Sequence, residues 1–309
     1  MIHRCLCLLV ILVPFLCFSQ LGEPRSAEIT IQSDEQFDFA EQALQKGEYQ
    51  RAITEFERFI HFFAGDEKVP KARYLIGISH LKAKGYAEAR NVFEEIMKIY
   101  PDKPIAGEAL FMIGESYYKQ GVFEEAERYF QQVIDLHPLP EMKNRAIYRI
   151  GWSRMQTGRW REASENFKGV ERGSRLYPSA GDLSEKSLKG EALPYKAPAT
   201  AGVMAALVPG LGHAYCERYK DAVVAFLLNG LFIWAAYESF DEDHEALGAI
   251  LSFVELGWYS GNIYSAVNCA HKYNRNVKNN FLRTMADDLD VGLLTTRQGH
   301  LGLALQIHF

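Results

Sequence analysis

Three polar side chains in the C-terminal third could do chemistry, because each stands in an otherwise apolar stretch: His213, Asn229 and Glu255. Imidazole and carboxyl groups transfer protons, and an ionisable group inside a membrane-length segment is a candidate for proton or ion coupling. Coupling would require Glu255 to face water. The alternative is structural, with Glu255 hydrogen-bonded to Asn229 or to His213 inside a passive helical bundle.

The rest of the sequence offers no further site for catalysis. It contains no nucleophile paired with a base, no phosphate-binding loop and no supported carboxylate pair, so we expect no enzyme and no cofactor. Of five cysteines, Cys216 and Cys269 follow the N-terminal region without CxxC or metal-ligand spacing, which predicts two buried free thiols and no metal. With 34 basic and 39 acidic residues, the chain lacks the basic field that nucleic-acid binding requires.

A 37-residue interval organises the chain between residues 34 and 178. Alanines recur at this interval, each with an aromatic residue three positions earlier and a phenylalanine four positions later. Upstream, a second aromatic residue precedes a small residue by three positions in every copy. Five positions kept in register through four copies predict a repeat architecture. The positions are, in this order, Ala52, Ala89, Ala126, Ala163; Tyr49, Tyr86, Phe123, Trp160; Phe56, Phe93, Phe130, Phe167; Phe37, Tyr74, Phe111, Tyr148; and Ala40, Gly77, Gly114, Gly151.

Each copy predicts two helices joined by a turn, the second beginning at the aromatic residue before the alanine. The alanine is small because the two helices of a hairpin are expected to cross closely there. A glycine that tolerates positive φ is expected to end the first helix, at Gly47, Gly85, Gly121 or Gly158. A proline that cannot continue a helix is expected to stop the second one in the last three copies, at Pro101, Pro138 and Pro178.

These residues resemble the tetratricopeptide repeat. In the third copy the family's pattern of Gly, aromatic, Gly, Ala, Phe and Pro falls on Gly114, Tyr117, Gly121, Ala126, Phe130 and Pro138. The resemblance implies an all-α fold, a helix-turn-helix solenoid of four repeats over residues 34–178. The family's usual period is about 34 residues. The longer period here is similar to that of envelope repeat proteins such as the periplasmic partner of the Tol–Pal system.

The resemblance also implies a peptide-binding groove. In this family the first helix of each pair lines a concave face, and its fifth and twelfth positions point into that face. Aromatic side chains at a binding surface give large contact area at low entropic cost. The alternative is that these rings pack between neighbouring repeats and meet no ligand. The implied groove residues are Phe37, Leu44, Tyr74, Leu81, Phe111, Tyr118, Tyr148, Trp152 and Met155.

The segments that flank the solenoid carry other signals. Residues 1–19 combine a basic start with an apolar run and predict a secretory signal, whether cleaved or retained as an anchor. Residues 179–197 are rich in Gly, Ser, Lys and Glu and predict a linker. Residues 276–309 form a C-terminal tail whose alternating end resembles the terminal strand signal of outer-membrane barrels, with an accidental tail as the alternative.

Residues 198–275 predict a helical membrane domain with two or three membrane segments. Residues 221–240 and 246–268 are apolar over about twenty residues, the length that crosses a bilayer. Residues 199–215 are shorter and are broken by a Pro-Gly-Leu-Gly sequence, so they either span or re-enter the membrane. A soluble helical hairpin is the alternative.

The start of this domain, Pro209-Gly210-Leu211-Gly212-His213-Ala214-Tyr215, resembles the small two-helix membrane modules typified by the TM2 domain. That resemblance implies no known chemistry. Basic residues at 218–220 and 271–278 flank an acidic loop at 241–245, and the positive-inside rule puts the basic flanks in the cytoplasm. An exported repeat domain then requires residues 199–215 to cross the membrane.

Charge is uneven along the repeats. Residues 34–67 carry nine acidic and three basic side chains, and residues 143–175 carry three and nine. The basic end is a candidate surface for anionic lipid headgroups, with an ordinary solvated surface as the alternative. Its leading residues are Arg145, Arg149, Arg154, Arg159 and Arg161.

These features predict a non-enzymatic, membrane-anchored scaffold of the cell envelope. Its repeat domain is expected to be exported to the periplasm and to bind another protein or peptide, with membrane lipid as a second partner and no nucleic acid. The alternative is a transport- or channel-accessory protein that uses the intramembrane Glu255. The sequence leaves open the partner's identity, the oligomeric state and the choice between inner and outer membrane.

Overall fold

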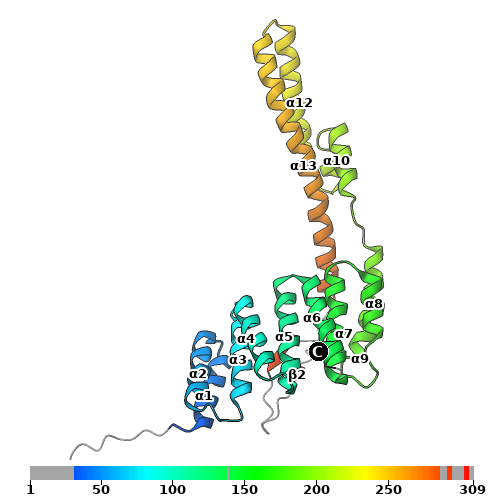
Figure 1. The fold of residues 1–309 in the computed structure, drawn as a ribbon. Helices are drawn as coiled ribbons and strands as arrows, with labels where there is room; N and C mark the ends of the chain where they lie inside the picture. Colours follow the sequence, from blue (N-terminus) through cyan, green and yellow to red (C-terminus); the bar gives the residue numbers. More distant parts are fainter. Residues whose placement is uncertain (1–30, 138, 286–290, 294–302, 306–309) are drawn as a thin grey trace, which may run out of the picture. The chain divides into compact units, whose positions relative to one another are not determined.

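The structure, a computed structural model, describes residues 31–137, 139–285, 291–293 and 303–305, so the predicted signal at residues 1–19 lies outside the described part. Most described residues are helical, which confirms the all-α prediction (Figure 1). The chain divides into two compact units, Met1–Ser79 and His80–Phe309.

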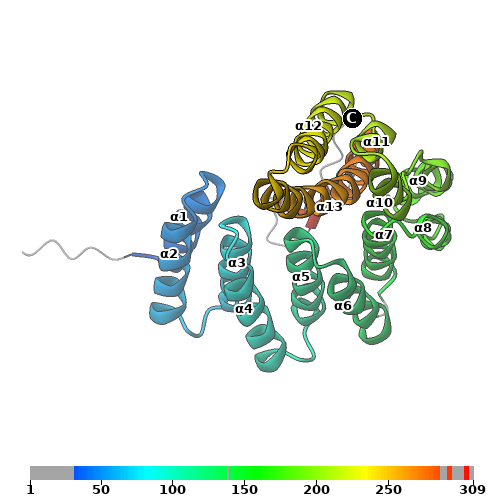
Figure 2. The same cartoon turned by 90° about the horizontal axis from the view of Figure 1, so that it is seen from above.

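The repeats form four pairs of consecutive helices, and every second helix begins at the predicted aromatic residue. In the second unit, α4 to α8 lie side by side in chain order (Figure 2). The pairs are α1 (Ser33–Gln45) with α2 (Tyr49–Phe62), α3 (Val69–Lys82) with α4 (Tyr86–Ile99), α5 (Pro104–Gln120) with α6 (Phe123–Leu136), and α7 (Pro140–Gln156) with α8 (Trp160–Lys168).

The small residues of the repeat lie where two helices approach each other. A Cβ atom on Gly114 of α5 would lie 2.6 Å from the ring of Phe130 on α6, so a larger residue would displace that ring. The next repeat has the same arrangement, with 2.7 Å between a Cβ on Gly151 and the ring of Phe167. The four repeated alanines have no exposed surface, as close helix packing requires.

The turn inside each repeat uses a residue in the left-handed region, although not always the predicted glycine. Gly47, Gly121 and Gly158 have φ of +79°, +82° and +80°. In the second repeat Lys84 takes this position with φ +64°, and Gly85 follows it with φ −78°. The prediction for Gly85 is therefore wrong by one residue, because the repeat interval fixes the turn even where it falls on lysine.

The fourth repeat ends earlier than the sequence predicted. α8 stops at Lys168, and Pro178 lies in the first turn of α9 (Tyr177–Leu188). Proline is tolerated there because the first N–H groups of a helix have no partner within the helix. Pro178 therefore starts a helix and does not end one.

The predicted linker at 179–197 is wrong for its first half, because α9 continues through it. Ala180 and Leu183 are buried, and α9 packs against α8. The sequence resembled a linker because, apart from Leu183, the buried face of α9 consists of small residues. A short 3-10 helix, Lys189–Ala192, follows before the chain extends into the next domain. The result is a helix that covers the end of the last repeat, as terminal capping helices do in solenoids.

The C-terminal domain is built on a long antiparallel hairpin, α12 (Tyr219–Asp241) and α13 (Glu245–Arg283), preceded by α10 (Pro198–Leu207) and α11 (Leu211–Tyr215) (Figure 1). α13 continues beyond residue 275. The predicted boundary between the membrane domain and a tail at 276 is therefore wrong, because the same helix runs through it.

The segment before α12 turns back on itself. α10 runs along α13 as far as Ala206, whose carbonyl accepts a hydrogen bond of 3.2 Å from Tyr259. The chain turns at Gly210, φ +84°, where an added side chain would collide with the backbone of α12. α11 then returns, and the Tyr215 hydroxyl accepts a hydrogen bond of 3.1 Å from the N–H of Ala197. Both ends of the segment therefore lie at the same end of the hairpin, so the segment doubles back on itself and does not run the length of the hairpin.

Two short strands follow the last helix. β1 (Val291–Leu293) pairs antiparallel with β2 (Leu303–Leu305). The alternating C-terminal sequence is thus a strand over Leu303–Leu305, and its remaining residues lie outside the described part of the chain.

Candidate functional site

Most of the residues expected to line the groove lie in the core of the repeats. Their rings and alkyl chains remove apolar surface from water, which stabilises by about 25 cal/mol per Å². These side chains are therefore packed inside the repeat domain, whereas partner binding at the concave face stays a prediction. The buried members are Phe37, Leu44, Tyr74, Leu81, Phe111, Tyr148, Trp152 and Met155.

Aromatic contacts show how these side chains are used. In the first repeat, Phe37 packs edge-on against Phe56 and Phe59, with ring centroids 5.6 and 5.2 Å apart. In the third repeat, Phe111 lies 5.2 Å from Phe130. Each of these pairs joins the first helix of a repeat to the second helix of the same repeat. The predicted groove residues Phe37 and Phe111 therefore make structural contacts within their own repeats.

Tyr118 is the one predicted groove residue that is only partly buried. Its ring lies 5.5 Å from that of Phe123, and the Arg149 guanidinium stands 5.0 Å from its centroid. Among the nine predicted groove residues, Tyr118 is therefore the best placed to touch a partner.

The end of α13 packs against the last repeat. Phe281 meets the ring of Trp160 edge-on, with centroids 5.4 Å apart. Leu282 and Met285 are buried in the same apolar cluster as Trp152. The predicted groove residues of the fourth repeat are therefore covered by the chain's own C-terminal helix.

A polar contact reinforces this packing. The Lys278 ammonium group donates a hydrogen bond of 2.7 Å to the carbonyl oxygen of Gln156, at the C-terminal end of α7. A cation is favourable there, because carbonyl groups at a helix C-terminus carry partial negative charge. Burial, with Arg275 nearby, lowers the pKa of Lys278 below its ordinary value. A signal for this contact is present in the sequence, the apolar pair Phe281-Leu282 shortly after the basic residues that end at Lys278.

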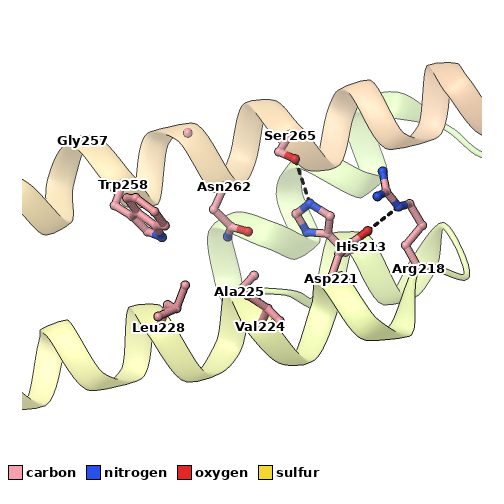
Figure 3. Close-up of a pocket in the computed structure, with 11 residues that line it drawn as sticks. His213, Arg218, Asp221, Val224, Ala225, Leu228, Gly257, Trp258, Asn262 and Ser265 are labelled. Carbon is pink, nitrogen blue, oxygen red and sulfur yellow. Dashed lines mark hydrogen bonds and ion pairs between the residues drawn. The ribbon is translucent and has the colours of Figure 1, made fainter.

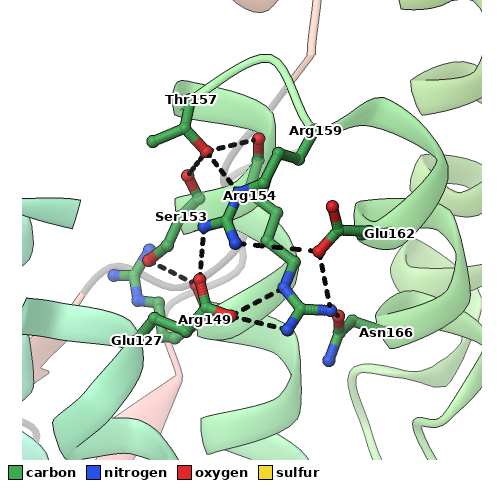
Figure 4. A network of polar contacts seen from close by, with 8 residues as sticks. All are labelled: Glu127, Arg149, Ser153, Arg154, Thr157, Arg159, Glu162 and Asn166. Carbon is green, nitrogen blue, oxygen red and sulfur yellow. Dashed lines mark hydrogen bonds and ion pairs between the residues drawn. The ribbon is translucent and has the colours of Figure 1, made fainter. Parts of the chain in front are cut away.

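The basic end of the solenoid is largely neutralised from within. Arg145 pairs with Glu108 at 3.0 Å, and Glu127 lies between Arg154 and Arg159 (Figure 4). These carboxylates belong to the preceding repeat, so charge of one sign in one repeat meets the opposite sign in its neighbour. The interpretation of this end as a free basic surface for lipid headgroups is wrong for these arginines. Arg161 remains exposed beside Glu191, 3.3 Å away.

Arg149 and Glu115 form an ion pair in the core, with N and O atoms 2.6 Å apart and side chains 2% and 0% exposed. A second hydrogen bond of 3.0 Å joins the same two groups. The repeat interval offers a signal that the sequence analysis missed. The equivalent positions carry apolar residues in two of the other three copies, Leu75 and Met112 for Arg149, and Ile78 and Trp152 for Glu115, whereas the first copy carries Asp38 and Glu41.

The three polar candidates of the C-terminal domain do not form one site. His213 Nε2 lies 3.0 Å from the Ser265 hydroxyl, and the Asn229 amide donates to the carbonyl of Ala225 at 2.6 Å. Glu255 is buried, and neither carboxyl oxygen has a hydrogen-bond partner in the described structure. The expected hydrogen bond from Glu255 to Asn229 or His213 is therefore absent.

Two of the cavities along the hairpin are lined by the polar candidates. One of about 520 Å³ is lined by residues of α11, α12 and α13 that include His213 and Ser265 (Figure 3). A second, of about 380 Å³, lies toward the far end of the hairpin and is lined by Glu255 and apolar residues. His213 and Glu255 thus face different cavities, and only the first cavity combines charged, amide and apolar groups.

The remaining candidates for chemistry are the two cysteines and possible metal ligands. Cys216 and Cys269 are free and buried, as expected. Within the described ranges, no group of three or more His, Cys, Asp or Glu side chains could hold a metal ion.

A family model described as tetratricopeptide repeat matches residues 69–138, which span the second and third copies. Residues 69–138 are therefore similar to tetratricopeptide repeats. No curated protein matches the chain. These observations support a tetratricopeptide-repeat fold in which the repeats recur every 37 residues.

Several solved structures are similar to the chain. TPR-like repeats from Podosopora anserina are 14% identical, cover 52% of this chain and 87% of their own, and give a TM-score of 0.43. A tetratricopeptide repeat protein from Parabacteroides merdae is 14% identical, with 82% and 98% covered and a TM-score of 0.40. The Rap conjugation regulator of plasmid pLS20, in complex with the Phr* peptide, is 14% identical, with 87% and 82% covered and a TM-score of 0.42.

The family match does not extend to the C-terminal domain. Of the described helices, only α12 is long and apolar enough to cross a membrane by length and composition. Large apolar side chains are exposed along both helices of the hairpin, for example Leu227 and Trp234 on α12 and Phe253 and Leu256 on α13. Apolar surface of this extent marks a face that contacts a membrane or another protein.

Proposed function

We propose that this protein is a non-enzymatic scaffold of the cell envelope. Its tetratricopeptide repeats bind another protein or peptide, and its C-terminal hairpin anchors them to a membrane. The observation that carries the proposal is the joining, in one chain, of a repeat fold whose family mediates protein–protein contacts to a hairpin with an apolar outer face.

Membrane anchoring is supported by the length of the hairpin. α12 has 23 residues, and at 1.5 Å per residue that length exceeds the roughly 30 Å of a bilayer core. The signal-like residues 1–19, the similarity of the repeat period to Tol–Pal-associated proteins and the TM2-like start at 209–215 favour the envelope. Extraction with alkaline carbonate tests the anchor: release of the full-length chain into the soluble fraction would contradict it.

The side of the membrane that holds the repeats can be argued from the hairpin. Both ends of residues 198–215 lie at one end of it, and α13 returns to the same end to reach the last repeat. The repeats therefore share a side with the basic flanks, Arg218 and Lys272 among them. Export to the periplasm, as the signal predicts, then puts these flanks outside as well, against the positive-inside rule.

Labelling in intact cells distinguishes the two orientations. Glu185→Cys places a thiol at an exposed position of α9, whereas Cys216 and Cys269 are buried. Modification by a membrane-impermeant maleimide before lysis supports export. Modification only after lysis puts the repeats in the cytoplasm and rejects the export proposal. The matched control is Asp243→Cys in the turn between α12 and α13, which lies on the opposite side if the hairpin spans the membrane and should show the opposite pattern.

Partner binding is best tested at Tyr118. Tyr118→Ala is expected to weaken capture of the partner, because this ring is the accessible member of the predicted groove. Tyr129→Ala is the matched control: the same residue type, also partly buried, on the second helix of the same repeat, where its ring stacks on Tyr117. Equal capture by both variants would place the binding surface elsewhere.

Transport or channel accessory activity is the second candidate, favoured by one observation. The Glu255 carboxyl group is buried beside a cavity of about 380 Å³ and has no hydrogen-bond partner in the described structure. Glu255→Gln keeps the shape but removes the titratable proton. Loss of cellular function with membrane retention and partner binding intact would favour ion or proton coupling over a passive anchor.

A further inference from the structure

The hairpin cavity lined by His213 and Ser265, of about 520 Å³, has the size of a small-molecule site, for which about 300–1,000 Å³ is typical. It lies between α12 and α13, close to α11 (Figure 3). Gly257 and Gly261 of α13 line it, and an added Cβ at either position would meet no atom within 4 Å. The protein therefore leaves this space open at the two positions where its own side chains could have filled it.

Two buried side chains at the cavity have polar atoms without a hydrogen-bond partner among the described residues. Asn262 is 7% exposed, and neither its amide nitrogen nor its amide oxygen is hydrogen-bonded within the described residues. His213 is 5% exposed, and its Nδ1 atom likewise has no partner in that part of the chain. Buried polar groups are nearly always hydrogen-bonded, so an exception at a cavity indicates an absent partner. Together these two side chains offer a donor and at least one acceptor.

The cavity wall changes from polar to apolar along the hairpin. Arg218 and Asp221 form an ion pair at one end, and Leu228 and Trp258 lie at the other (Figure 3). Leu228 lies seven positions after Asp221 on α12, which corresponds to a rise of about 10 Å along the helix. Asn262 lies between the two ends. A matching ligand has a polar head and an apolar chain.

The charge at the polar end favours a neutral head group. Because Arg218 is already paired with Asp221, the two side chains contribute no net charge to attract an ion. The groups without partners are an amide and an imidazole nitrogen, which suit hydroxyl groups that both donate and accept. Val224, which lines the cavity, is 55% exposed on the apolar outer face of the hairpin. The cavity therefore adjoins the surface through which a lipid-like molecule would arrive.

We propose that this cavity binds a neutral single-chain amphiphile with a hydroxyl-bearing head group, of the chemical class of a monoacylglycerol. The head group hydrogen-bonds with Asn262 and His213, and the first part of the acyl chain lies over Gly261 and Gly257 toward Leu228 and Trp258. The same chemistry is available from a bilayer or from amphiphile free in solution.

The test uses the full-length chain in phosphatidylcholine vesicles with a photoactivatable monoacylglycerol that carries a diazirine in its chain. We expect saturable labelling of residues 224–228 and 257–262, and unlabelled monoacylglycerol should displace the probe. The corresponding fatty-acid anion should displace the probe about tenfold less well than monoacylglycerol does, which is the ratio expected for one lost hydrogen bond. Adding the probe from the vesicle lipid or from solution distinguishes the two sources. Labelling spread evenly over the apolar face would overturn the proposal.

Variants separate the site from the surface. Asn262→Leu removes the hydrogen-bonding amide, and Gly261→Leu fills the open space without weakening the helix, because leucine is a better helix former than glycine. Both should reduce labelling about tenfold. Gly230→Leu is the matched control, since Gly230 also has open space around it but does not line the cavity. Full labelling of Gly261→Leu would show that the probe does not occupy this cavity and would overturn the proposal.

Discussion

The buried pair Glu115–Arg149 gives the sharpest prediction about the repeats. Both side chains are almost fully enclosed, so removing one charge leaves the other uncompensated in the core. Breaking a buried ion pair in this way typically costs about 3–5 kcal/mol. Glu115→Gln keeps the volume of the side chain and removes only its charge, and we expect it to lower the stability of the α5–α7 region by that amount.

Replacing both partners should behave differently. Two well-packed apolar residues of similar volume are often neutral or stabilising by about 1–4 kcal/mol relative to a buried pair. The chain itself supplies suitable residues, because other copies carry Ile78 at the position of Glu115 and Met112 at that of Arg149. Glu115→Ile combined with Arg149→Met should therefore recover most or all of the stability that Glu115→Gln loses.

Hydrogen exchange measured by mass spectrometry on the full-length chain can report this locally. Since about 1.4 kcal/mol corresponds to a factor of ten, a loss of about 3 kcal/mol accelerates exchange of amides in α5 and α7 on the order of a hundredfold. Glu125→Gln is the control, because its pair with Arg128 is exposed and such pairs contribute only about 0–1 kcal/mol. Equal exchange in Glu115→Gln and Glu125→Gln, or a double variant no more stable than Glu115→Gln, would refute the reasoning.

Two further predictions concern packing. Ala126→Leu should destabilise the third repeat by about 1–3 kcal/mol through overpacking, and the effect should reach neighbouring repeats; an unchanged unfolding temperature would contradict the assigned register. Phe281→Ala removes the edge-on contact with Trp160, worth about 0.5–1.5 kcal/mol beyond its apolar area, so exchange should rise at residues 276–283 while residues 245–268 keep their protection.

The fold of the repeats could be predicted from the sequence because their signal recurs. The start of each second helix at Tyr49, Tyr86, Phe123 and Trp160 was confirmed, since one pattern repeated four times outweighs local ambiguity. The one-residue error at Gly85 has the opposite origin. That prediction depended on residue type, because glycine favours positive φ, whereas the 37-residue interval places the turn at Lys84.

The ends of the domains could not be predicted in the same way, because no repeat constrains them. α9 buries small residues such as Ala180, which give little hydrophobic signal. Similarly, the continuation of α13 past residue 275 depends on a tertiary contact with Trp160, far away in the sequence. Local composition alone indicated a linker and a tail at these two places.

The groove residues show a different limit. A family register states which helix face a residue occupies, but a face between two packed helices and a face open to solvent have the same apolar composition. Phe111 and Tyr148 are fully enclosed, whereas Tyr118, seven residues after Phe111, remains partly accessible. Sequence spacing could not separate them, because the difference depends on how neighbouring helices cover each turn.

The continuous helix α13 connects the hairpin with the last repeat. Its first half forms the hairpin with the cavity at Asn262, and its last turns cover the final repeat at Trp160. The described helix has neither a glycine nor a proline between Asn262 and Phe281, so no usual site of kinking separates the two ends. A partner that displaced Phe281 from the last repeat would therefore move the base of the hairpin with it. This coupling distinguishes the arrangement from a repeat domain tethered by a flexible linker, in which binding at one end would leave the other unchanged.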